Sequence, residues 1–346
     1  MRSISVRTGK PYEVHIKAGL LSRTGELLAA KGLRGKIAVI SDDCVLPLHG
    51  AAVTKSLAEA GFQAVTCTFP NGEESKNMDT VSRILEFLAE HSLSRSDLIV
   101  ALGGGVVGDI AGFCAAIYLR GIRFVQLPTT LLAAIDSSVG GKTGVDLSSG
   151  KNMAGAFWQP EVVLCDPDVL ETLPDEIFNE GVAEAIKYGV IADRELFELL
   201  AAGRLQHELE QVIERCVQIK SQLVSEDEFD RGNRQLLNFG HTIGHAVEAC
   251  SNFRLRHGQA VAIGMVMMAQ IAWKKGWSSE NCENPIREAL ARFRLPLESP
   301  YDFRSLSTAM LADKKRKGDE ITMVVPERIG KAVLKRIPTA ELPALF

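Results

Sequence analysis

The chain has 346 residues, of which 46% are hydrophobic and 24% are charged. This length exceeds what one hydrophobic core usually supports, so we expect two domains. The formal net charge of −4 gives no basis for nucleic-acid binding, which normally uses a basic face.

The seven cysteines are odd in number and scattered, and no two form a Cys-x-x-Cys pair. This pattern predicts free thiols in a reducing compartment. The first residues lack the apolar core of a signal peptide. The longest apolar stretch, around 260–273, is too short to span a bilayer and contains Gly264 and Gln270. We therefore expect a cytoplasmic protein that does not bind membranes.

The first half of the chain alternates strand-like and helix-like segments. Residues 1–7 alternate polar and apolar side chains in the manner of a strand. Further strands are predicted at 36–41, 63–69, 97–102 and 125–127, with helices at 53–61 and 78–91. Such alternation is typical of a parallel, Rossmann-like sheet with helices on both faces. We assign this α/β domain to residues 1–174.

The pattern changes at about residue 174. Helical periodicity continues through 176–202, 204–225, 235–250, 258–275 and 283–293, and few β-branched runs remain. The second domain, residues 175–346, is therefore predicted to be mostly α-helical.

A glycine-rich turn at 103–109 follows one predicted strand and opens a helix-like segment. Such a turn lets a phosphate group approach the backbone N–H groups of a helix N-terminus. The turn is not Gly-x-Gly-x-x-Gly, so it predicts either a dinucleotide site or only a tight strand-to-helix connection. Asp42 ends an earlier strand and could bind a ribose hydroxyl or serve as a turn residue.

The segment 128–152 carries glycines, hydroxyls and two lysines, and it cannot form a regular helix. Its 140–143 portion resembles the end of a nucleotide-binding P-loop, but that motif requires glycine where the chain has Asp136. This excludes a P-loop. Two interpretations remain: an anion pocket made by Lys142, Lys151 and Asn152, or solvated loop lysines.

Three of the seven histidines, His241, His245 and His257, lie close together in the sequence, each beside a glycine that would let a backbone or a ligand come close. Histidine is the side chain most often used to bind transition metals or to move protons near neutral pH. His241 and His245 are spaced i,i+4, which alone predicts these two as metal ligands, with His257 as a third candidate. Three structural histidines are the alternative.

Glu184 could supply a carboxylate to complete a three-ligand metal centre with open positions for substrate. Glu184 and Lys187 share a helix face and could also form only a surface ion pair. Lys220, Arg234 and the basic run 314–317 add cations to the helical half. These cations would either form an anion-binding site around a metal or lie on a solvated face of the protein.

The chain resembles the 3-dehydroquinate synthase family over nearly its whole length. The motifs that carry the resemblance lie at 72–76, 103–109, 120–122, 128–133, 136–144, 150–152, 171–174, 184–189, 237–245, 257–258 and 313–315. The resemblance implies a two-domain fold related to glycerol and iron-containing alcohol dehydrogenases. It also implies NAD in the α/β domain and a divalent metal, zinc or cobalt.

The implied reaction converts 3-deoxy-D-arabino-heptulosonate 7-phosphate, a small anionic keto acid, into 3-dehydroquinate and phosphate in the shikimate pathway. NAD⁺ is consumed and regenerated within each turnover. Oxidation of one hydroxyl acidifies the neighbouring C–H, phosphate leaves, hydride returns, and an intramolecular aldol step closes the ring.

The resemblance also implies residue roles. It makes Glu184, His241 and His257 the metal ligands, and it places His245 near the substrate as a proton-transfer partner, against the i,i+4 interpretation. The resemblance implies that Arg234 and Lys220 bind the substrate carboxylate and that Asp136 and Lys187 contact the substrate hydroxyls. It implies a homodimer in which the phosphate is bound by Lys142, Asn152, Asn238, one of Lys314 and Lys315, and Arg120 of the neighbouring subunit. The implied NAD contacts are Asp42, Glu73, Lys76, Gly104, Gly105, Val106, Asp109, Thr129, Thr130, Lys142, Lys151 and Thr172.

Two positions depart from the family pattern: Cys44 stands where Asn is frequent, and Asp230 where Glu is more usual. Neither touches the implied chemistry. Two alternative enzymes are a related cyclase acting on sedoheptulose 7-phosphate or an aminated heptulosonate, and a metal-dependent NAD alcohol dehydrogenase. Retention of Arg234 and Lys220 argues against a substrate without a carboxylate. An inactive binding protein is disfavoured because no implied site position is missing.

Overall fold

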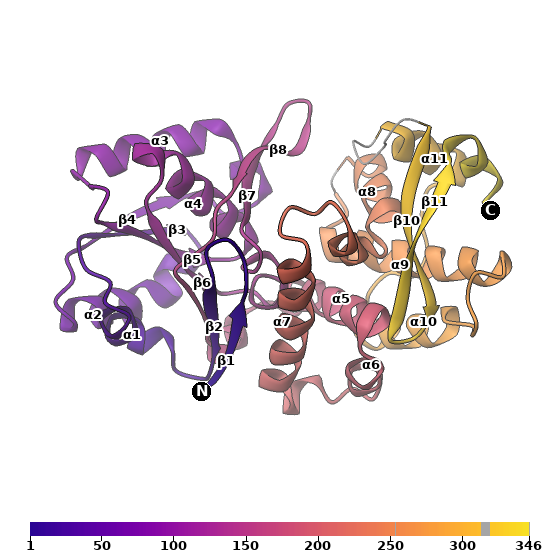
Figure 1. Cartoon of the computed structure of the whole chain (residues 1–346), viewed down its shortest axis with the longest axis horizontal. Helices are drawn as coiled ribbons and strands as arrows, with labels where there is room; N and C mark the ends of the chain where they lie inside the picture. The colour runs from indigo at the N-terminus through magenta and orange to yellow at the C-terminus, as the bar shows by residue number, and fades with distance from the viewer. Residues whose placement is uncertain (253, 313–318, 346) are drawn as a thin grey trace. The chain divides into compact units, whose positions relative to one another are not determined.

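The computed structural model describes residues 1–252, 254–312 and 319–345. The chain divides into two units (Figure 1). The first contains Met1–Pro174 and Lys220–Phe229, and the second contains Asp175–Ile219 and Asp230–Phe346. Residues 220–229, which the sequence analysis assigned to the second domain, thus group with the first unit.

A seven-stranded sheet forms the centre of the first unit. Its strands, in spatial order, are β1 (Arg2–Val6), β2 (Tyr12–Ile16), β9 (Val162–Cys165), β6 (Arg123–Pro128), β5 (Leu98–Gly103), β3 (Ile37–Asp42) and β4 (Ala64–Phe69). Only the β1–β2 pair is antiparallel in this sheet; its other pairs are parallel. The predicted parallel sheet is confirmed, whereas β2 and β9 were not predicted.

Helices cover both faces of this sheet: α1 (Thr24–Ala30) and α2 (Ala51–Glu59) lie on one side, and α3 (Met78–Glu90) and α4 (Gly105–Ile117) lie on the other (Figure 1). Every residue of β3 and β5 is buried, as expected for apolar strands covered on both faces. Ile40 and Ile99 of these strands pack against Ile84 of α3 and Ile110 of α4. Asn77 caps α3 by accepting the N–H of Thr80.

The glycine-rich segment after β6 is not a regular α-helix, as predicted. It forms the short helix η5 (Ala133–Ser137) and an antiparallel hairpin of β7 (Lys142–Leu147) and β8 (Gly150–Phe157) (Figure 1). Val145 of this hairpin joins the core beneath α4. The other short helices among the described residues are η1 (Leu21–Arg23), η2 (Leu46–Gly50), η3 (Glu73–Ser75), η4 (Tyr118–Arg120), η6 (Pro167–Thr172), η7 (Leu205–His207), η8 (Asn233–Asn238) and η9 (Thr339–Ala344).

The second unit is mostly helical. Its helices are α5 (Asp175–Ala192), α6 (Arg194–Ala201), the first part of α7 (Leu209–Glu226), α8 (His241–Cys250), α9 (His257–Lys274), α10 (Glu283–Arg292) and α11 (Phe303–Ala312). The predicted helix at 176–202 is two helices, because Asp193 caps α6 by accepting the N–H of Leu196. The antiparallel pair β10 (Glu320–Arg328) and β11 (Lys331–Pro338) was not predicted.

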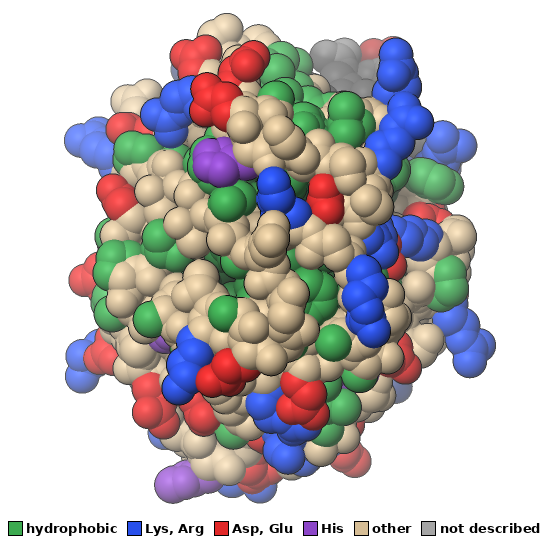
Figure 2. Space-filling view, turned by 90° about the vertical axis from the view of Figure 1, so that its left-hand side faces the viewer, with side chains coloured by type: hydrophobic (Ala, Val, Ile, Leu, Met, Phe, Trp, Pro, Cys, Tyr) green, Lys and Arg blue, Asp and Glu red, His purple; other side chains and the backbone are tan. Residues whose placement is uncertain are grey.

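The seven cysteines are free. Among the described residues, no helix combines the length and apolar character needed to cross a bilayer. Figure 2 shows one face of the first unit, on which acidic and basic side chains are interspersed with other residues.

Candidate functional site

The contact between α8 and α9 depends on glycine. A β-carbon on Gly264 of α9 would overlap the carbonyl oxygen of Gly240, the residue that precedes α8. Gly240 has a φ of 76°, in the left-handed region, and a β-carbon there would lie 2.6 Å from Cγ of Met265. A β-carbon on Gly244 would lie 3.0 Å from the carbonyl oxygen of Ala260. The two helices can therefore approach closely enough to bring His241 and His257 together.

Another close approach joins α9 to α5. A β-carbon on Gly258 would lie 2.5 Å from Cα of Glu180, one helical turn before Glu184. Gly258 therefore lets the start of α9, with His257, lie directly against α5. The glycines beside the histidines thus allow neighbouring backbones to come close.

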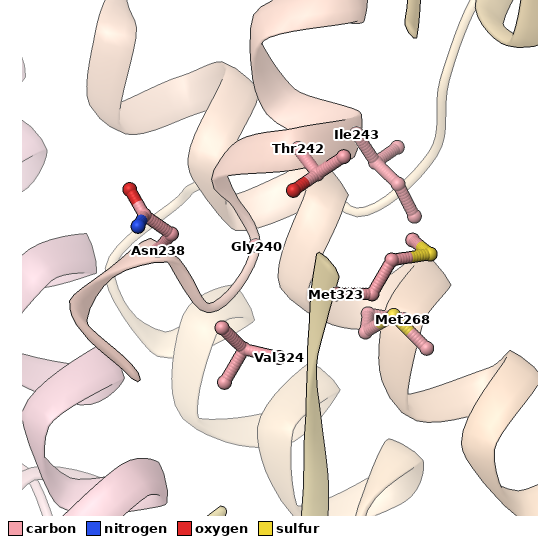
Figure 3. A pocket seen from close by; sticks show the side chains of 7 residues that line it. All are labelled: Asn238, Gly240, Thr242, Ile243, Met268, Met323 and Val324. Atoms are coloured by element: carbon pink, nitrogen blue, oxygen red, sulfur yellow. The ribbon is translucent and has the colours of Figure 1, made fainter. Parts of the chain in front are cut away.

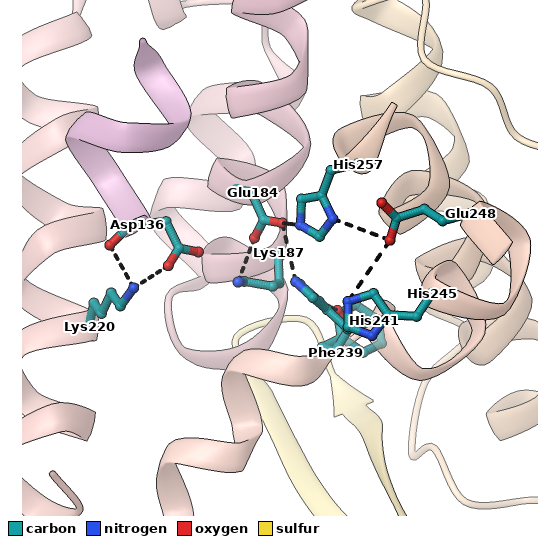
Figure 4. A network of polar contacts seen from close by, with 9 residues as sticks. All are labelled: Asp136, Glu184, Lys187, Lys220, Phe239, His241, His245, Glu248 and His257. Atoms are coloured by element: carbon teal, nitrogen blue, oxygen red, sulfur yellow. Dashed lines mark hydrogen bonds and ion pairs between the residues drawn. The ribbon is translucent and has the colours of Figure 1, made fainter. Parts of the chain in front are cut away.

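Glu184, His241 and His257 converge on one point. Oε1 of Glu184 lies 3.4 Å from Nε2 of His241 and 3.3 Å from Nε2 of His257 (Figure 4). Ligands held at about 2.1 Å by a tetrahedral zinc ion lie about 3.4 Å from one another. The donor set and its spacing therefore fit a divalent metal.

The other nitrogen of each imidazole faces an acceptor. Nδ1 of His241 lies 3.0 Å from the carbonyl oxygen of Phe239, and Nδ1 of His257 lies 3.5 Å from Oε2 of Glu248. A proton on Nδ1 leaves the lone pair of Nε2 directed toward Glu184, which is the usual arrangement of metal-binding histidines. Both rings are thus oriented as ligands by their surroundings.

Electrostatics also favour a cation at this point. Burial alone would lower the pKa of His257, but the carboxylates of Glu184 and Glu248 outweigh it and raise the pKa to about 10. Nζ of Lys187 lies 2.5 Å from Oε2 of Glu184, and both side chains are buried. The predicted Glu184–Lys187 contact is therefore a buried ion pair rather than a surface one.

His245 lies outside this convergence point. Its Nε2 is 4.0 Å from Oε2 of Glu248, and its side chain is 38% exposed. Among the described residues, no group of three potential ligands contains both His241 and His245. The geometry therefore favours the set with Glu184 over the i,i+4 pair of histidines.

A cavity beside the start of α8 has a volume of about 10 Å³, which is at the lower limit for one water molecule. Its lining residues are Asn238, Gly240, Thr242, Ile243, Met268, Met323 and Val324 (Figure 3). It is too small for a phosphorylated sugar acid. Asn238 borders it from η8, and Arg234 of the same short helix is only 1% exposed.

The first unit has its own candidate site at the carboxyl ends of β3 and β5. The chain leaves β3 toward β4 and leaves β5 in the opposite direction toward β6, so a topological switch point lies between them. Ligands of open α/β sheets bind at such points. The turn after β5 provides Gly104 and the N-terminus of α4, which begins at Gly105. Phosphate binding at this helix N-terminus is physically favourable.

Several predicted cofactor residues cluster beside this turn. Nζ of Lys76 lies 2.7 Å from Oδ2 of Asp109 and donates to Oδ1 of Asn152 at 2.7 Å. Burial alone would lower the pKa of Lys76, but the carboxylates of Asp109 and Glu73 outweigh it and raise the pKa. Lys151 lies 3.5 Å from Glu73. Lys76 is therefore a buried cation held by carboxylates of its own unit.

The remaining predicted NAD contacts occupy loops of the first unit. Thr129 donates its N–H to the carbonyl oxygen of Gly103, and Thr130 accepts the N–H of Ala133, so the loop after β6 lies against the glycine turn. Val106 is half-buried in the first turn of α4. Thr172 is exposed and lies 3.0 Å from Nε2 of His49.

The carboxylate of Asp42 makes hydrogen bonds within the turn that follows β3 and with Asn71. Its Oδ1 accepts the N–H groups of Cys44 and Val45, and its Oδ2 accepts from Asn71. These contacts are those of a turn residue, and a ribose contact stays a prediction.

Asp136 and Lys220 contact one another. Lys220 donates to the carbonyl oxygen of Asp136 at 2.6 Å and to its carboxylate (Figure 4). Lys220 is 6% exposed, so this pair is largely removed from solvent. Lys142 and Arg120 are both exposed, at the start of β7 and the end of η4. Lys314 and Lys315 lie outside the described residues.

Two residues of these clusters were not singled out from the sequence. Glu248 faces both His257 and His245, and Asp146 accepts the N–H of Asn152 while donating its own N–H to the carbonyl of Lys76. The position of Glu248 three residues after His245 was a usable signal, because such residues share a helix face. The contacts of Asp146 depend on the hairpin fold and had no comparable signal.

Comparisons with known proteins identify the family of the chain. Family models for the 3-dehydroquinate synthase N-terminal and C-terminal domains match residues 66–180 and 181–316. The 3-dehydroquinate synthase of Streptococcus thermophilus is 45% identical over 339 residues, which covers 96% of each chain.

Two solved structures are similar over nearly the whole chain. One is a 2-deoxy-scyllo-inosose synthase in complex with carbaglucose-6-phosphate, NAD⁺ and Co²⁺ (TM-score 0.89, 25% identity, 99% of each chain). The other is the 2-epi-5-epi-valiolone synthase of Streptomyces hygroscopicus with NAD⁺ and Zn²⁺ (TM-score 0.88, 27% identity, 99% of this chain and 97% of that chain). They confirm the predicted fold class, and the chain belongs to the 3-dehydroquinate synthase family of enzymes.

Proposed function

We propose that this chain converts 3-deoxy-D-arabino-heptulosonate 7-phosphate into 3-dehydroquinate and phosphate, using NAD⁺ and a divalent metal, zinc or cobalt. The observation that carries the proposal is the convergence of Glu184, His241 and His257 in a chain of this family. A bound metal would polarise the hydroxyl that is oxidised, and NAD⁺ would accept and return the hydride.

The side chains of the protein would bind and orient a doubly anionic substrate. Arg234 and Lys220 are buried cations suited to charge-assisted hydrogen bonds with a carboxylate. The proposed phosphate contacts are Lys142, Asn152, Asn238, Arg120 of a neighbouring subunit, and Lys314 or Lys315. His245 is only half-buried beside the metal ligands, so it could exchange protons with substrate. Asp136 and Lys187 would hold the reacting hydroxyls.

We assign NAD binding to residues 1–174 and metal and substrate binding to residues 175–346. The topological switch point, the N-terminus of α4 and the cluster around Lys76 support the first assignment. The glycine-dependent contact of α8 with α9 supports the second. The free cysteines are in keeping with a cytoplasmic location.

A homodimer is part of the proposal. Arg120 and Leu119 have φ angles of 66° and 51°, which are unfavourable for residues with a β-carbon. Leu119 and the neighbouring Ile117 are each 40% exposed. Strained backbone beside exposed apolar side chains is typical of a segment whose role involves a partner.

Phosphate release is the test of the reaction. The protein, loaded with NAD⁺ and Zn²⁺ or Co²⁺, should release inorganic phosphate from the heptulosonate phosphate without net formation of NADH. Net NADH with a simple alcohol would instead identify an alcohol dehydrogenase. Faster turnover of sedoheptulose 7-phosphate, which lacks the carboxylate, would identify a different cyclase and contradict the role of Arg234 and Lys220.

Subunit mixing tests the contribution of Arg120. The variants Arg120→Ala and His245→Ala should each be inactive as homodimers. In a mixed dimer, the His245→Ala subunit donates Arg120 to a site that retains His245, so a random mixture should recover about a quarter of wild-type activity. No recovery after verified subunit exchange would show that Arg120 acts within its own subunit.

A further inference from the structure

Glu248 is a buried carboxylate on α8 beside the proposed metal ligands. Its side chain is 3% exposed, and Oε2 lies 3.5 Å from Nδ1 of His257 and 4.0 Å from Nε2 of His245 (Figure 4). A buried carboxylate is costly unless its charge is compensated. The contacts with two imidazoles therefore indicate that this carboxylate acts on the neighbouring histidines.

Glu248 and Glu184 face different nitrogens of the same ring. Glu184 lies at Nε2 of His257, whereas Glu248 lies at Nδ1. A metal bound by Glu184, His241 and Nε2 of His257 would thus be separated from Glu248 by the imidazole. Glu248 faces Nδ1 of His257 in the same way that the carbonyl oxygen of Phe239 faces Nδ1 of His241.

We propose that Glu248 is a positioning residue that holds His257 in the tautomer with its proton on Nδ1. This inference rests on the proposed metal site. The carboxylate accepts the Nδ1 proton, which leaves the lone pair of Nε2 directed at the metal position and makes the ring a stronger ligand. The present separation of 3.5 Å is an ion-pair distance, and it should shorten toward about 2.8 Å, the length of a charge-assisted hydrogen bond, when Nε2 is bound.

A second metal ion is the competing interpretation. His245, Glu248 and His257 also form a group whose potential ligand atoms lie within 4.8 Å of one another. Occupation of both groups would require His257 to bind metal through both nitrogens and to lose both ring protons. The positioning role needs only the neutral imidazole, so the chemistry favours it.

Metal affinity, measured by chelator competition with Zn²⁺ alone, tests the proposal. Glu248→Ala should bind zinc about 10- to 100-fold more weakly than wild type, as is usual when such a partner is lost. Glu248→Gln should recover part of the loss, because its amide oxygen can still accept the Nδ1 proton. Glu283→Gln, which removes a half-buried carboxylate paired with Arg287 on α10, is the matched control and should bind zinc normally.

The ring N–H of His257 gives a readout that a merely structural role would not change. In the zinc-loaded, ¹⁵N-histidine-labelled protein, this proton should be shifted downfield and protected from exchange, and Glu248→Ala should abolish both properties. Unchanged affinity and an unchanged N–H signal in Glu248→Ala would overturn the proposal while leaving the metal site intact. Two zinc ions per wild-type chain, with one lost in Glu248→Ala, would also overturn it. Absence of zinc binding by wild type would instead remove the metal site and the inference together.

Discussion

The charged groups of the two units are compensated in different ways. In the first unit, the buried ammonium groups of Lys76 and Lys220 each face a carboxylate, from Asp109 and Asp136. In the second unit, Glu184 and Glu248 approach His257 from both sides, and the pKa of that imidazole rises to about 10. In the first unit, each of these ammonium groups is neutralised by a carboxylate of the same unit. In the second unit, the two carboxylates around His257 attract a cation, either a proton or a metal ion.

This difference distinguishes charged side chains that stabilise the fold from charged side chains that are placed to bind a ligand. An ion pair inside one unit stabilises that unit without any added group. In the second unit, the ammonium group of Lys187 pairs with Glu184, but two carboxylates still face the one imidazole of His257. A bound cation should stabilise this arrangement, so the second unit should be the one whose stability depends on metal.

The largest expected effect comes from Gly264→Val. The side chain would overlap the carbonyl oxygen of Gly240 and force α8 away from α9, so the second unit should lose about 3 kcal/mol or more of stability and all metal binding. Hydrogen exchange of α8 and α9 amides and zinc titration measure both losses. Gly276→Ala is the control, because a β-carbon there meets no atom within 4 Å and only its positive φ of 66° is unfavourable, at about 1 kcal/mol. Equal effects of the two variants would contradict the role of the helix contact.

The next largest effects distinguish His257, a proposed metal ligand, from the neighbouring His245. His257→Ala should abolish stoichiometric zinc binding, because it removes one of three converging ligands. His245→Ala should retain zinc but lower kcat by about 100- to 10,000-fold, the range expected when a proton-transfer group is lost. Metal analysis after dialysis and steady-state kinetics measure the two properties. The reverse pattern would favour the i,i+4 histidines as ligands.

The features of this site that depend on local spacing were accessible from the sequence. The glycines beside the three histidines indicated close backbone contacts, and those contacts are present at Gly240, Gly244 and Gly258. The apolar runs that became β3 and β5 predicted buried parallel strands correctly.

The features that depend on tertiary contacts were not accessible. Glu248 meets His257 because α8 packs on α9, and Lys220 meets Asp136 because residues 220–229 group with the first unit. The i,i+4 spacing predicted His241 and His245 as a pair, but it could not show that Glu184 approaches from α5. The pair β10–β11 was missed because its charged and exposed positions weaken the alternation of a strand.

A smaller effect is expected from Lys76→Met in the first unit. The substitution leaves the carboxylate of Asp109 without its 2.7 Å ion pair, which should cost about 3 kcal/mol in the absence of NAD. The double variant Lys76→Met/Asp109→Asn should be less destabilised than Lys76→Met, because no uncompensated charge remains. Hydrogen exchange of β5 and α4 amides measures the first unit separately. If Lys76 serves only the cofactor, neither variant will change exchange in the NAD-free protein.

The smallest effect concerns Asp97, which is also compensated within the first unit. It accepts the N–H groups of Ser94 and Lys36 at 2.6 Å each. Burial alone would raise the pKa of Asp97, but these hydrogen bonds outweigh it and hold the pKa below its usual value. Asp97→Asn should therefore cost about 1.5 kcal/mol at pH 7, the lower end of the range for hydrogen bonds to a charged group, because the amide keeps one acceptor oxygen.

The sign of the pH dependence follows from this lowered pKa. The ionised carboxylate of Asp97 stabilises the fold above the unfolded-state pKa of about 3.9, and this stabilisation is lost as the pH falls through the lower folded-state value. The difference in unfolding free energy between wild type and Asp97→Asn should thus be constant near neutrality and shrink below about pH 4. Urea titrations at a series of pH values measure it, with Glu86→Gln as a control at an exposed position of α3. A non-zero difference that stays constant below pH 4 would mean that the loss in Asp97→Asn does not come from the charge of Asp97, and that compensation in the first unit does not require this charge.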